Sequence, residues 1–380
     1  MAHRELFDLD DGVVWLNSAH QSALPRAAAE AAAEAVRWKM RPWQLTTERF
    51  AGVPDALRQS LGRLIGARAD EIMLANGASF GLHAIAGGMR LEAGDEVLVM
   101  QGDFPSNILP WLLREKDGVV VRALAPRRAV LEPDEVASAI GPRTRAVCLS
   151  WVHSFSGHAL DITAIGAQCR QSGVAFVVNA TQALGVRPID VASLPVDAIV
   201  ASGWKWLCGP YATGFFWVRP ELLAELTCRQ AYWLSMQTAD ELARAAEPSL
   251  PTSWGPRQFE VFGTANFFQF HPFNASVTML LSIGAHQAGR TIDALVDRLI
   301  SGLDTASCRL VSPADGPARS SLVVLAPRDP ARTAQVHRRL LDAGIVTALR
   351  RGNIRVSPHV YNTPAEIDRA LEVLQSGAAG

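Results

Sequence analysis

The chain has 380 residues, of which 49% are hydrophobic, so it is long enough to bury a large core and to divide into a larger and a smaller lobe. Its 36 Lys and Arg residues nearly balance its 37 Asp and Glu residues, and the absence of a basic block argues against nucleic acid as a partner. No apolar run reaches the length of a membrane span, and the acidic start of the chain is unlike a signal peptide. We therefore expect a cytoplasmic protein that binds neither nucleic acid nor membranes.

The five cysteines are odd in number and widely spaced, and no two of them form a CxxC pair. This arrangement argues against a disulfide framework and against a structural zinc site, and we predict no other metal site. We expect the cysteines to pack inside the protein in a reducing compartment.

The first half of the chain alternates predicted helices with apolar runs that are typical of buried strands. An Ala-rich stretch over residues 26–36 predicts a helix, and residues 161–173 form an amphipathic helical segment. The predicted strands cover residues 96–100, 118–124, 145–152, 174–180, 197–202 and 214–218. Strands that are apolar throughout and alternate with helices predict an α/β protein with a mostly parallel sheet, covered on both faces. In such sheets ligands bind at the carboxyl ends of the strands.

After about residue 220 the pattern changes, and a long helical stretch covers residues 278–303. A second group of elements then follows, with strands at 320–327 and 353–360 and helices at 333–344 and 363–377. The last helix has Thr363 at its cap and Pro364 in its first position, where proline is favoured. These elements predict a small α+β unit at the end of the chain.

The stretch SGWKWLCGPYATG, Ser202–Gly214, places Lys205 between two tryptophans. An ammonium group beside large apolar rings loses solvation, which lowers its pKa and makes the amine available as a nucleophile. This is the setting of a lysine that forms an imine with a carbonyl compound. The alternative is a lysine whose stem crosses an apolar patch and whose amine lies in solvent.

Together with the apolar run before it, VVNATQALGVRPIDVASLPVDAIVA, this stretch resembles the class V aminotransferase family of fold type I pyridoxal 5'-phosphate (PLP) enzymes. The resemblance covers nearly the whole chain and is strongest to the branch of isopenicillin N epimerase-like and cysteine desulfurase-like enzymes. It implies a large domain with a mostly parallel sheet between helices and a smaller C-terminal α+β domain. We accordingly assign residues 1–25 to an N-terminal segment on the substrate side, 26–265 to the large PLP-binding domain, and 266–380 to an interface helix and the small domain.

The resemblance assigns cofactor roles to three residues of this region. Lys205 corresponds to the lysine that holds PLP as a Schiff base, and its spacing from Asn179 matches that of the family. Asn179 corresponds to the residue that faces the pyridine nitrogen, where the family has an aspartate. Gln182 corresponds to a glutamine that hydrogen-bonds the phenolic oxygen of the cofactor.

The stretch LANGASFGLHAIA, residues 74–86, predicts a strand, a turn of small residues and a helix whose first N–H groups form an anion site. The resemblance implies that this turn and two residues near the lysine bind the cofactor phosphate: Gly77, Ala78, Ser79, Ser202 and Trp204. Trp204 stands where the family usually has a phosphate-binding histidine, so one donor is lost. The alternative for the turn alone is an ordinary tight connection.

The resemblance also assigns a stacking ring and a carboxylate-binding residue. Phe104, in GDFPSNILPW, corresponds to the ring stacked on the cofactor, and it can stack but cannot exchange protons. Arg355, in RRGNIRVSPHVYN, corresponds to the arginine that binds the substrate α-carboxylate, which a planar guanidinium suits. Arg350 and Arg351 precede it and are either helpers or unrelated to the site.

Two further assignments concern the entrance of the site and the oligomer. His20, in WLNSAHQSALP, corresponds to the substrate-side loop, although a surface histidine is an equal alternative. Thr264, in FEVFGTANF, corresponds to a threonine that reaches the phosphate of a partner subunit. The resemblance therefore implies a homodimer.

Two departures from the family bear on the reaction. The neutral amide of Asn179 holds the pyridine nitrogen protonated far less well than a carboxylate does, which disfavours transamination above all. The loop over residues 342–355 contains no cysteine, so we expect that the protein is not a persulfide-forming cysteine desulfurase.

The leading hypothesis is a PLP enzyme that acts on an amino acid through an external aldimine and Cα-deprotonation. Elimination of a β- or γ-leaving group, such as carbon–sulfur cleavage, or epimerisation would follow. An aminotransferase is the first alternative. A non-catalytic PLP-binding homologue is the second, and the presence of Lys205, Gln182 and Arg355 argues against it.

Overall fold

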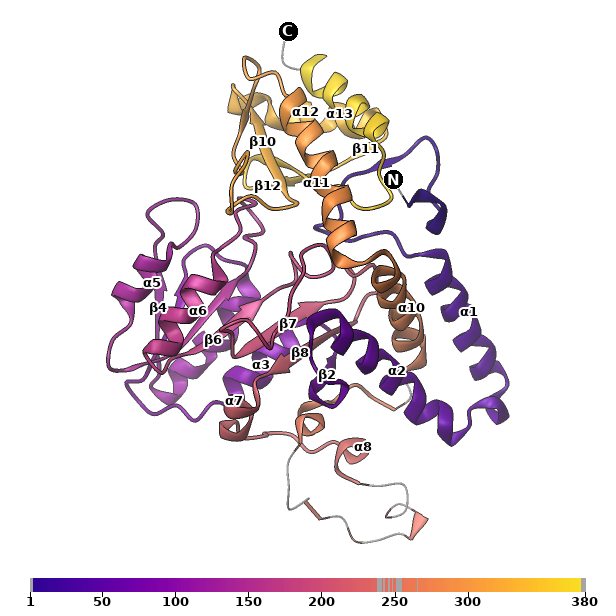
Figure 1. Ribbon diagram of the computed structural model, residues 1–380, viewed down its shortest axis with the longest axis vertical. Helices are drawn as coiled ribbons and strands as arrows, with labels where there is room; N and C mark the ends of the chain where they lie inside the picture. The colour runs from indigo at the N-terminus through magenta and orange to yellow at the C-terminus, as the bar shows by residue number, and fades with distance from the viewer. Residues whose placement is uncertain are drawn as a thin grey trace.

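A computed structural model of the chain describes residues 3–376, except for residues 238–240, 242, 245–246, 248, 251–254 and 265. Its centre is a seven-stranded sheet with the strand order β2-β8-β7-β6-β5-β3-β4, with helices on both sides (Figure 1). The strands are β2 (Ile72–Ala75), β3 (Glu96–Met100), β4 (Val120–Leu124), β5 (Thr144–Ser150), β6 (Ala175–Asn179), β7 (Ala198–Ser202) and β8 (Gly214–Val218). β8 is antiparallel to β2 and β7, and the pairs among β3 to β7 are parallel. The mostly parallel α/β sheet is thus confirmed.

The central strands are buried on both faces, which explains why they are apolar at every position rather than at alternate ones. On one face, α2 (Thr47–Ile65) and α6 (Ile162–Gln171) contribute to one core cluster, which also contains Val178 of β6. On the other face, α3 (Ala78–Gly88) contributes to a second cluster with the adjacent Val177. Successive strand residues therefore pack against different layers of helices.

The long helical stretch expected over residues 278–303 is not one helix. It spans the end of α10 (Phe267–Ile283) and α11 (Ala285–Gly302), which meet at Gly284. Gly284 has a φ of +81°, in the region that favours glycine, and this conformation interrupts the helix. α10 packs against both α2 and α1 (Arg26–Met40), the helix that the Ala-rich stretch predicted.

The C-terminal part forms a separate four-stranded antiparallel sheet with the order β12-β13-β10-β9. Its strands and flanking helices are β9 (Cys308–Leu310), β10 (Val323–Pro327), α12 (Thr333–Asp342), β12 (Ala348–Arg350), β13 (Asn353–Val356) and α13 (Pro364–Ser376). This is the small α+β unit that the sequence predicted. The exact domain limits stay predictions, and residue 265 at one of them lies outside the described residues.

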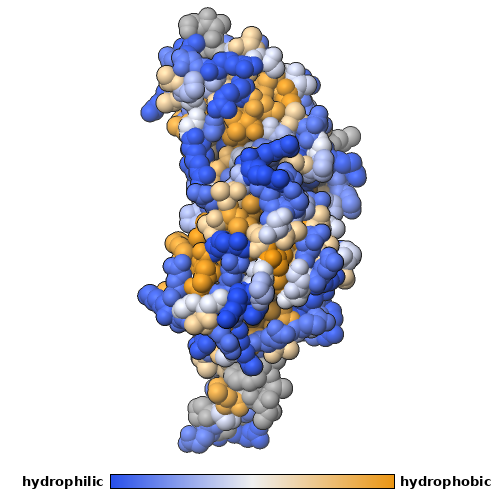
Figure 2. Space-filling model, turned by 90° about the vertical axis from the view of Figure 1, so that its left-hand side faces the viewer, coloured by the Kyte–Doolittle hydropathy of each residue, from blue (hydrophilic) through white to orange (hydrophobic). Residues whose placement is uncertain are grey.

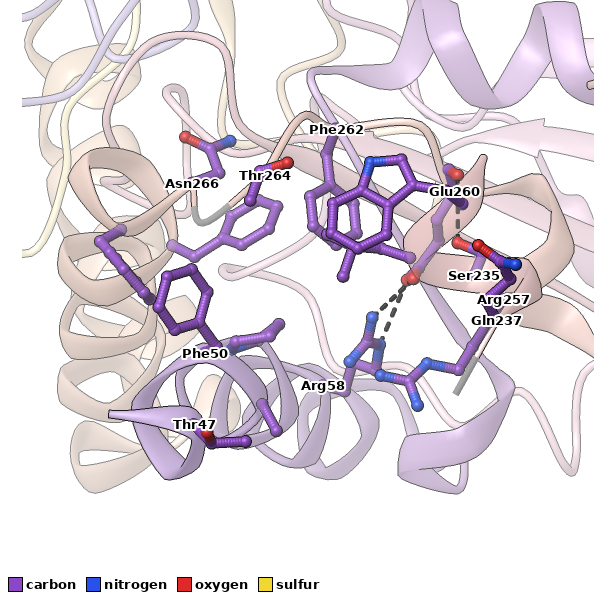
Figure 3. Close-up of a pocket in the computed structure, with 16 residues that line it drawn as sticks. Thr47, Phe50, Arg58, Ser235, Gln237, Arg257, Glu260, Phe262, Thr264 and Asn266 are labelled. Carbon is purple, nitrogen blue, oxygen red and sulfur yellow. Dashed lines mark hydrogen bonds and ion pairs between the residues drawn. The ribbon is translucent and has the colours of Figure 1, made fainter. Parts of the chain in front are cut away.

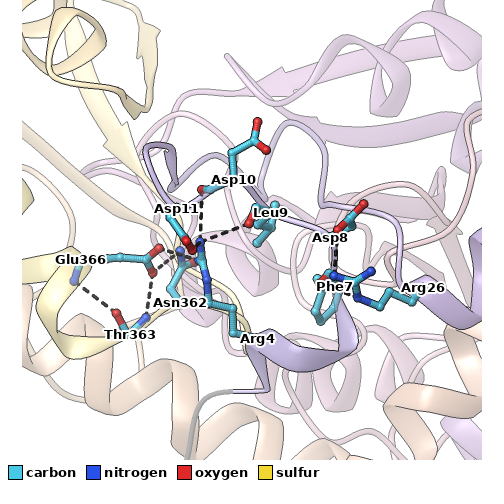
Figure 4. Close-up of polar contacts among 10 residues, drawn as sticks. All are labelled: Arg4, Phe7, Asp8, Leu9, Asp10, Asp11, Arg26, Asn362, Thr363 and Glu366. Carbon is cyan, nitrogen blue, oxygen red and sulfur yellow. Dashed lines mark hydrogen bonds and ion pairs between the residues drawn. The ribbon is translucent and has the colours of Figure 1, made fainter.

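The N-terminal segment packs against the C-terminal part of the chain. β1 (Val14–Trp15) pairs in parallel with β11 (Ile345–Val346). Nearby, Arg4 Nη1 donates to Glu366 Oε1 at 2.8 Å, and Figure 4 shows this contact joining the two ends of the chain. The chain then continues from β1 to His20, which lines the cavity described below.

Hydrophilic residues cover most of the face drawn in Figure 2, where hydrophobic residues gather in separate patches.

One edge of the large sheet is β4, and Arg122 on this strand forms an ion pair of 2.9 Å with Glu96. Charged side chains on an edge strand disfavour pairing with another chain. Within the described ranges, no helix has both the length and the apolar character needed to span a membrane.

A buried ion pair connects α2 to the chain before α10. Arg58 Nη2 lies 2.6 Å from Glu260 Oε2, and the two side chains are 3% and 2% exposed. Glu260 Oε1 also accepts from Arg58 Nε at 3.2 Å and from the N–H of Leu74 at 2.8 Å. Because the carboxylate has several donors, its burial is compensated, and it ties α2 to β2.

We predict that Glu260→Gln lowers the free energy of unfolding by about 3 kcal/mol, because it leaves a buried guanidinium without its main counter-charge. The measurement is the midpoint of urea unfolding. The control Arg298→Ala breaks the exposed pair with Asp368 and should leave the midpoint unchanged. Equal midpoints for Glu260→Gln and the wild type would contradict the prediction.

Candidate active site

A cavity of about 340 Å³ opens at the carboxyl ends of the central strands. Most of the residues that the sequence singled out line it: His20, Ala78, Ser79, Phe104, Asn179, Gln182, Ser202, Trp204, Lys205 and Arg355. Residues from both ends of the chain and from the large sheet thus meet in one place.

The sheet topology explains this convergence. Ser150, Asn179 and Ser202 are the last residues of β5, β6 and β7, and all three line the cavity. Ser150 and Asn179 are direct partners in the parallel register. Because parallel strands end at the same edge, side chains far apart in the sequence become neighbours there.

Lys205 follows the end of β7 and lines the cavity, and its Nζ lies 5.3 Å from the centre of the Phe104 ring. Burial lowers the pKa of this amine to about 7, and the positive charges of Arg355 and Arg350 add to the effect. At neutral pH a large fraction of Lys205 is therefore uncharged and nucleophilic. The alternative of a lysine whose amine lies in solvent does not describe this geometry.

The start of α3 offers an anion site next to the lysine. The N-cap residue, Gly77, has no side chain to cap this helix, and the N–H of Ala78 donates to Ser202 Oγ at 3.1 Å. Gly77 precedes the helix with a φ of +156°, and a Cβ on it would lie 3.1 Å from the Trp204 ring. The backbone can approach this closely only because residue 77 is a glycine. Free N–H groups at the start of a helix attract phosphate.

The amide of Asn179 is held in one orientation by its neighbours. Its Nδ2 donates to Asn107 Oδ1 at 2.8 Å, and its Oδ1 accepts from the N–H of Thr181 at 3.1 Å. Asn107 Nδ2 in turn donates to Asp103 Oδ2 at 2.8 Å. The N–H of Thr181 can only donate, and the carboxylate oxygen of Asp103 accepts here, so the orientations of the Asn179 and Asn107 amides are both fixed. One N–H of Asn179 remains for a ligand.

Sequence reasoning missed Asp103 and Asn107, although both lie in the stretch from which Phe104 was selected. Both side chains are buried, and Asp103 also accepts from the N–H and the Oγ of Ser150. A polar residue on each side of Phe104 was the available signal, but their partner Asn179 is distant in the sequence.

Gln182 connects the sheet edge to the N-terminal segment. Its Nε2 donates to the carbonyl oxygen of Ala19 at 2.9 Å, and its Oε1 accepts from Trp206 Nε1 at 2.9 Å. These partners fix the amide and leave its second N–H unassigned. The next residue along the segment, His20, lines the cavity, and burial and then Arg350 lower its pKa, so it is neutral near pH 7.

Two arginines of the C-terminal sheet reach the cavity. Arg355 on β13 is buried and donates from Nη1 to the carbonyl oxygen of Ser154 at 3.0 Å. Its buried Nε has no partner among the described residues, and burial, followed by Arg350, lowers its pKa to about 10. Arg350 on β12 lines the same cavity, whereas Arg351 does not. The structure thus separates Arg350 from Arg351, which the sequence left equivalent.

Thr264 is the one predicted site residue that lies elsewhere in the described chain. It lines a different pocket, of about 370 Å³, together with Phe50 and Phe262, next to the ion pair of Arg58 and Glu260 (Figure 3). Its assignment to the phosphate of a partner subunit stays a prediction.

Comparison with known proteins identifies the family of this fold and cavity. The family model of Aminotransferase class-V matches residues 41–370. The chain belongs to the class V aminotransferase family. Its cofactor is PLP, as the family and structures of a similar protein indicate.

Two similar curated proteins carry different activities in their names. A probable cysteine desulfurase of Methanothermobacter thermautotrophicus is 28% identical over 84% of this chain and 82% of its own length. Isopenicillin N epimerase of Streptomyces clavuligerus is 27% identical over 97% of this chain and 96% of its own length. The family therefore includes more than one reaction at this level of similarity.

Among solved structures, the fold is similar to that of C-DES, which is described as a cystine C–S lyase. One C-DES structure, with glycine covalently linked to its PLP, has a TM-score of 0.89 at 22% identity and covers 98% of this chain and 99% of its own. Another, in complex with cysteine persulfide as reaction product, has a TM-score of 0.86 at 22% identity and covers 95% and 96%. These similarities confirm fold type I.

The expectation that the protein is not a persulfide-forming cysteine desulfurase is wrong. It rested on the absence of a cysteine from residues 342–355, but relatives named as cysteine desulfurases and the persulfide complex of C-DES contradict it. In that complex the persulfide is a product molecule. A missing cysteine in one loop therefore does not exclude persulfide formation.

The residues of the cavity fit PLP. The start of α3 and Ser202 suit a phosphate, the Phe104 ring suits the face of an aromatic ring, and the neutral amine of Lys205 suits the aldehyde. The unpartnered Nε of Arg355 suits a carboxylate. When bound, PLP withdraws electrons from the Cα of an amino acid joined to it.

We predict that the initial rate at which PLP attaches to the cofactor-free protein rises with pH and reaches half its maximum near pH 7. Below this pH Lys205 is protonated and cannot attack the aldehyde, and above it the free amine predominates. The measurement is absorbance of the product, followed by borohydride reduction and peptide mapping. Lys205→Ala is the control and should give no reduced adduct. A half-maximum above pH 9 would contradict the lowered pKa.

Proposed function

We propose that this protein is a cytoplasmic PLP enzyme that removes the Cα proton of an amino acid and then expels a β- or γ-leaving group, such as a sulfur substituent. Epimerisation at Cα is the second candidate, because one curated relative is an isopenicillin N epimerase. The observation that carries the proposal is the fixed amide of Asn179 at the edge of the sheet, a position at which the resemblance to the family implies a carboxylate.

Asn179 decides how strongly the pyridine nitrogen is protonated. With its Oδ1 engaged by Thr181 and one N–H by Asn107, the amide keeps one N–H donor and one oxygen lone pair for a ligand, and it has no negative charge. Because a neutral amide stabilises a protonated ring nitrogen less than a carboxylate does, PLP bound here would withdraw electrons from Cα less strongly. β-Elimination tolerates this, because the electron pair that deprotonation leaves on Cα forms the Cα=Cβ bond while the leaving group departs with the electrons of its own bond to Cβ. Transamination has no such outlet, so Asn179 argues against an aminotransferase.

The remaining roles follow from the chemistry of the cavity. Arg355 would bind the α-carboxylate, and the amine of Lys205 would take the Cα proton at its Nζ. Phe104 covers a ring face and excludes water but cannot exchange protons. Elimination needs only one proton-transfer group, which Lys205 supplies. Epimerisation needs a second group on the opposite face, for which His20 is the neutral base that lines the cavity.

Two further parts of the proposal concern assembly and the non-catalytic alternative. We expect a homodimer in which Thr264 of one subunit serves the cofactor of the other, since it lies outside the lysine cavity of its own chain. A cavity that contains a lysine with a pKa of about 7 and an arginine, Arg355, whose Nε has no partner among the described residues argues against a homologue without catalytic activity.

The reaction is tested by incubating the PLP-loaded protein with cysteine, cystine and cysteine conjugates in D₂O. We expect deuterium at Cα of recovered substrate, together with 2-oxo acid, ammonia and a sulfur product. Deuterium with inversion and no oxo acid would identify epimerisation instead. The matched control is Lys205→Ala, which should exchange no Cα proton. Stoichiometric transfer of the amino group to an added oxo acid at a comparable rate would contradict the proposal.

We predict that Asn179→Asp protonates the pyridine nitrogen and increases side transamination. A carboxylate at this position stabilises the positive charge that an amide does not. The measurement is the ¹⁵N resonance of ring-labelled PLP, which reports protonation without turnover, together with the yield of pyridoxamine phosphate. The control Asn274→Asp keeps an acceptor for Ser60 outside the cavity and should change neither. A wild-type nitrogen that is already protonated would contradict the role assigned to Asn179.

A further inference from the structure

The lysine cavity has an excess of positive charge. Lys205, Arg350 and Arg355 line it, and no aspartate or glutamate is among its described lining residues. Neither arginine forms an ion pair with an acidic side chain in the part of the chain that the structure describes. Two uncompensated guanidiniums in a partly buried site are costly unless a ligand supplies the counter-charges.

The strand register places Arg350 and Arg355 on the same face of the sheet. Arg355 of β13 pairs with Ala348 of β12, and Arg350 of β12 pairs with Asn353 of β13. Directly paired residues share a face of the sheet, and so do residues two apart on one strand. Arg350 and Arg355 therefore project from the same face of this hairpin, two positions apart, which is about 7 Å along the strands.

The charges of the two arginines act differently on the titratable groups of the cavity. The charge of Arg355 depresses the pKa of Lys205 more than that of Arg350 does, whereas His20 at the cavity wall responds more to Arg350. Arg355 thus serves the position next to Lys205. Arg350, two strand positions away on the same face, is left for a second group of the ligand.

The adjacent arginine has a different role, which makes Arg350 the free one of the pair. The Arg351 guanidinium lies 3.8 Å from the centre of the Phe155 ring, and its Nη2 donates to the carbonyl oxygen of Gly102 at 3.0 Å. The hydrogen bond recorded for Arg350 within the described residues goes to the carbonyl oxygen of the preceding Leu349, at 3.1 Å. Most of its five donors are left for a ligand.

We propose that the substrate is an α-amino acid whose side chain carries a second anionic group, and that Arg350 binds this group while Arg355 binds the α-carboxylate. The inference rests on the proposed function, since it names the substrate class of that site. A side-chain carboxylate, a sulfinate, and the distal carboxylate of a disulfide-linked amino acid share the chemistry that Arg350 recognises. A guanidinium binds each of them through paired N–H donors.

The test compares acidic amino acids with their neutral isosteres on the PLP-loaded protein. L-glutamate is paired with L-glutamine and L-aspartate with L-asparagine, and L-cystine and L-cysteine sulfinate are added as sulfur compounds. The readout is the concentration that half-saturates the change in cofactor absorbance. We expect the acidic member of at least one pair to bind roughly ten- to hundredfold more tightly, as a charged hydrogen bond implies.

The decisive variant is Arg350→Gln, which removes the charge and keeps a shorter polar side chain. It should abolish the preference by weakening acidic ligands while leaving the affinity for the neutral isostere unchanged, which also shows that the site is intact. The matched control Arg351→Gln removes the neighbouring guanidinium and should keep the preference. The proposal is overturned if the wild type has no preference, if Arg350→Gln retains it, or if Arg351→Gln loses it equally.

The same experiment separates this inference from the proposed reaction. If acidic amino acids bind selectively through Arg350 but their Cα proton is not exchanged, the inference is supported and the proposed function is overturned. Exchange of the Cα proton at equal rates and affinities for acidic and neutral amino acids keeps the proposed function and overturns the inference.

Discussion

The site depends on one constraint, which is that parallel strands end at a common edge of the sheet. β5, β6 and β7 each contribute their last residue to the cavity, and α3 begins at the same edge because β2 runs parallel to β7 on the far side of β8. The sheet thereby sets the relative positions of the anion site, the Asn179 amide and Lys205. Each strand is buried on both faces, so this arrangement is held by the core rather than by the site itself.

Charge in the cavity couples the amine to its ligands. Burial and two nearby guanidiniums disfavour the ammonium form of Lys205, which keeps the amine nucleophilic when the guanidiniums have no anions. Anions bound to Arg355 and Arg350 weaken this repulsion and raise the basicity of the amine. The same arginines that select the substrate would then help Lys205 to accept a proton once the substrate is bound. Binding and proton transfer are linked through electrostatics.

The cavity is closed by parts of the chain that lie far apart in sequence. Gln182 at the sheet edge donates to Ala19 of the N-terminal segment, and Arg355 of the C-terminal sheet donates to Ser154 of the large sheet's loops. The N-terminal segment itself pairs with the C-terminal part through β1 and β11. A small displacement of the C-terminal part would therefore move the substrate-side residues together, while the cofactor-side residues on the large sheet stay in place.

The sequence by itself determined the α/β class, the strands and Lys205, because each depends on a local pattern of apolar residues or on a stretch that resembles the family. It did not separate Arg350 from Arg351, because only the register of β12 and β13 decides which guanidinium faces the cavity. It missed Asp103 and Asn107, since their role comes from a buried hydrogen bond to a distant strand. The break at Gly284 was also decided in three dimensions, where α10 packs against α1 and α2 and α11 packs against α13. The exclusion of persulfide formation was overturned by the similar proteins rather than by the fold, because a loop without a cysteine does not by itself exclude that chemistry.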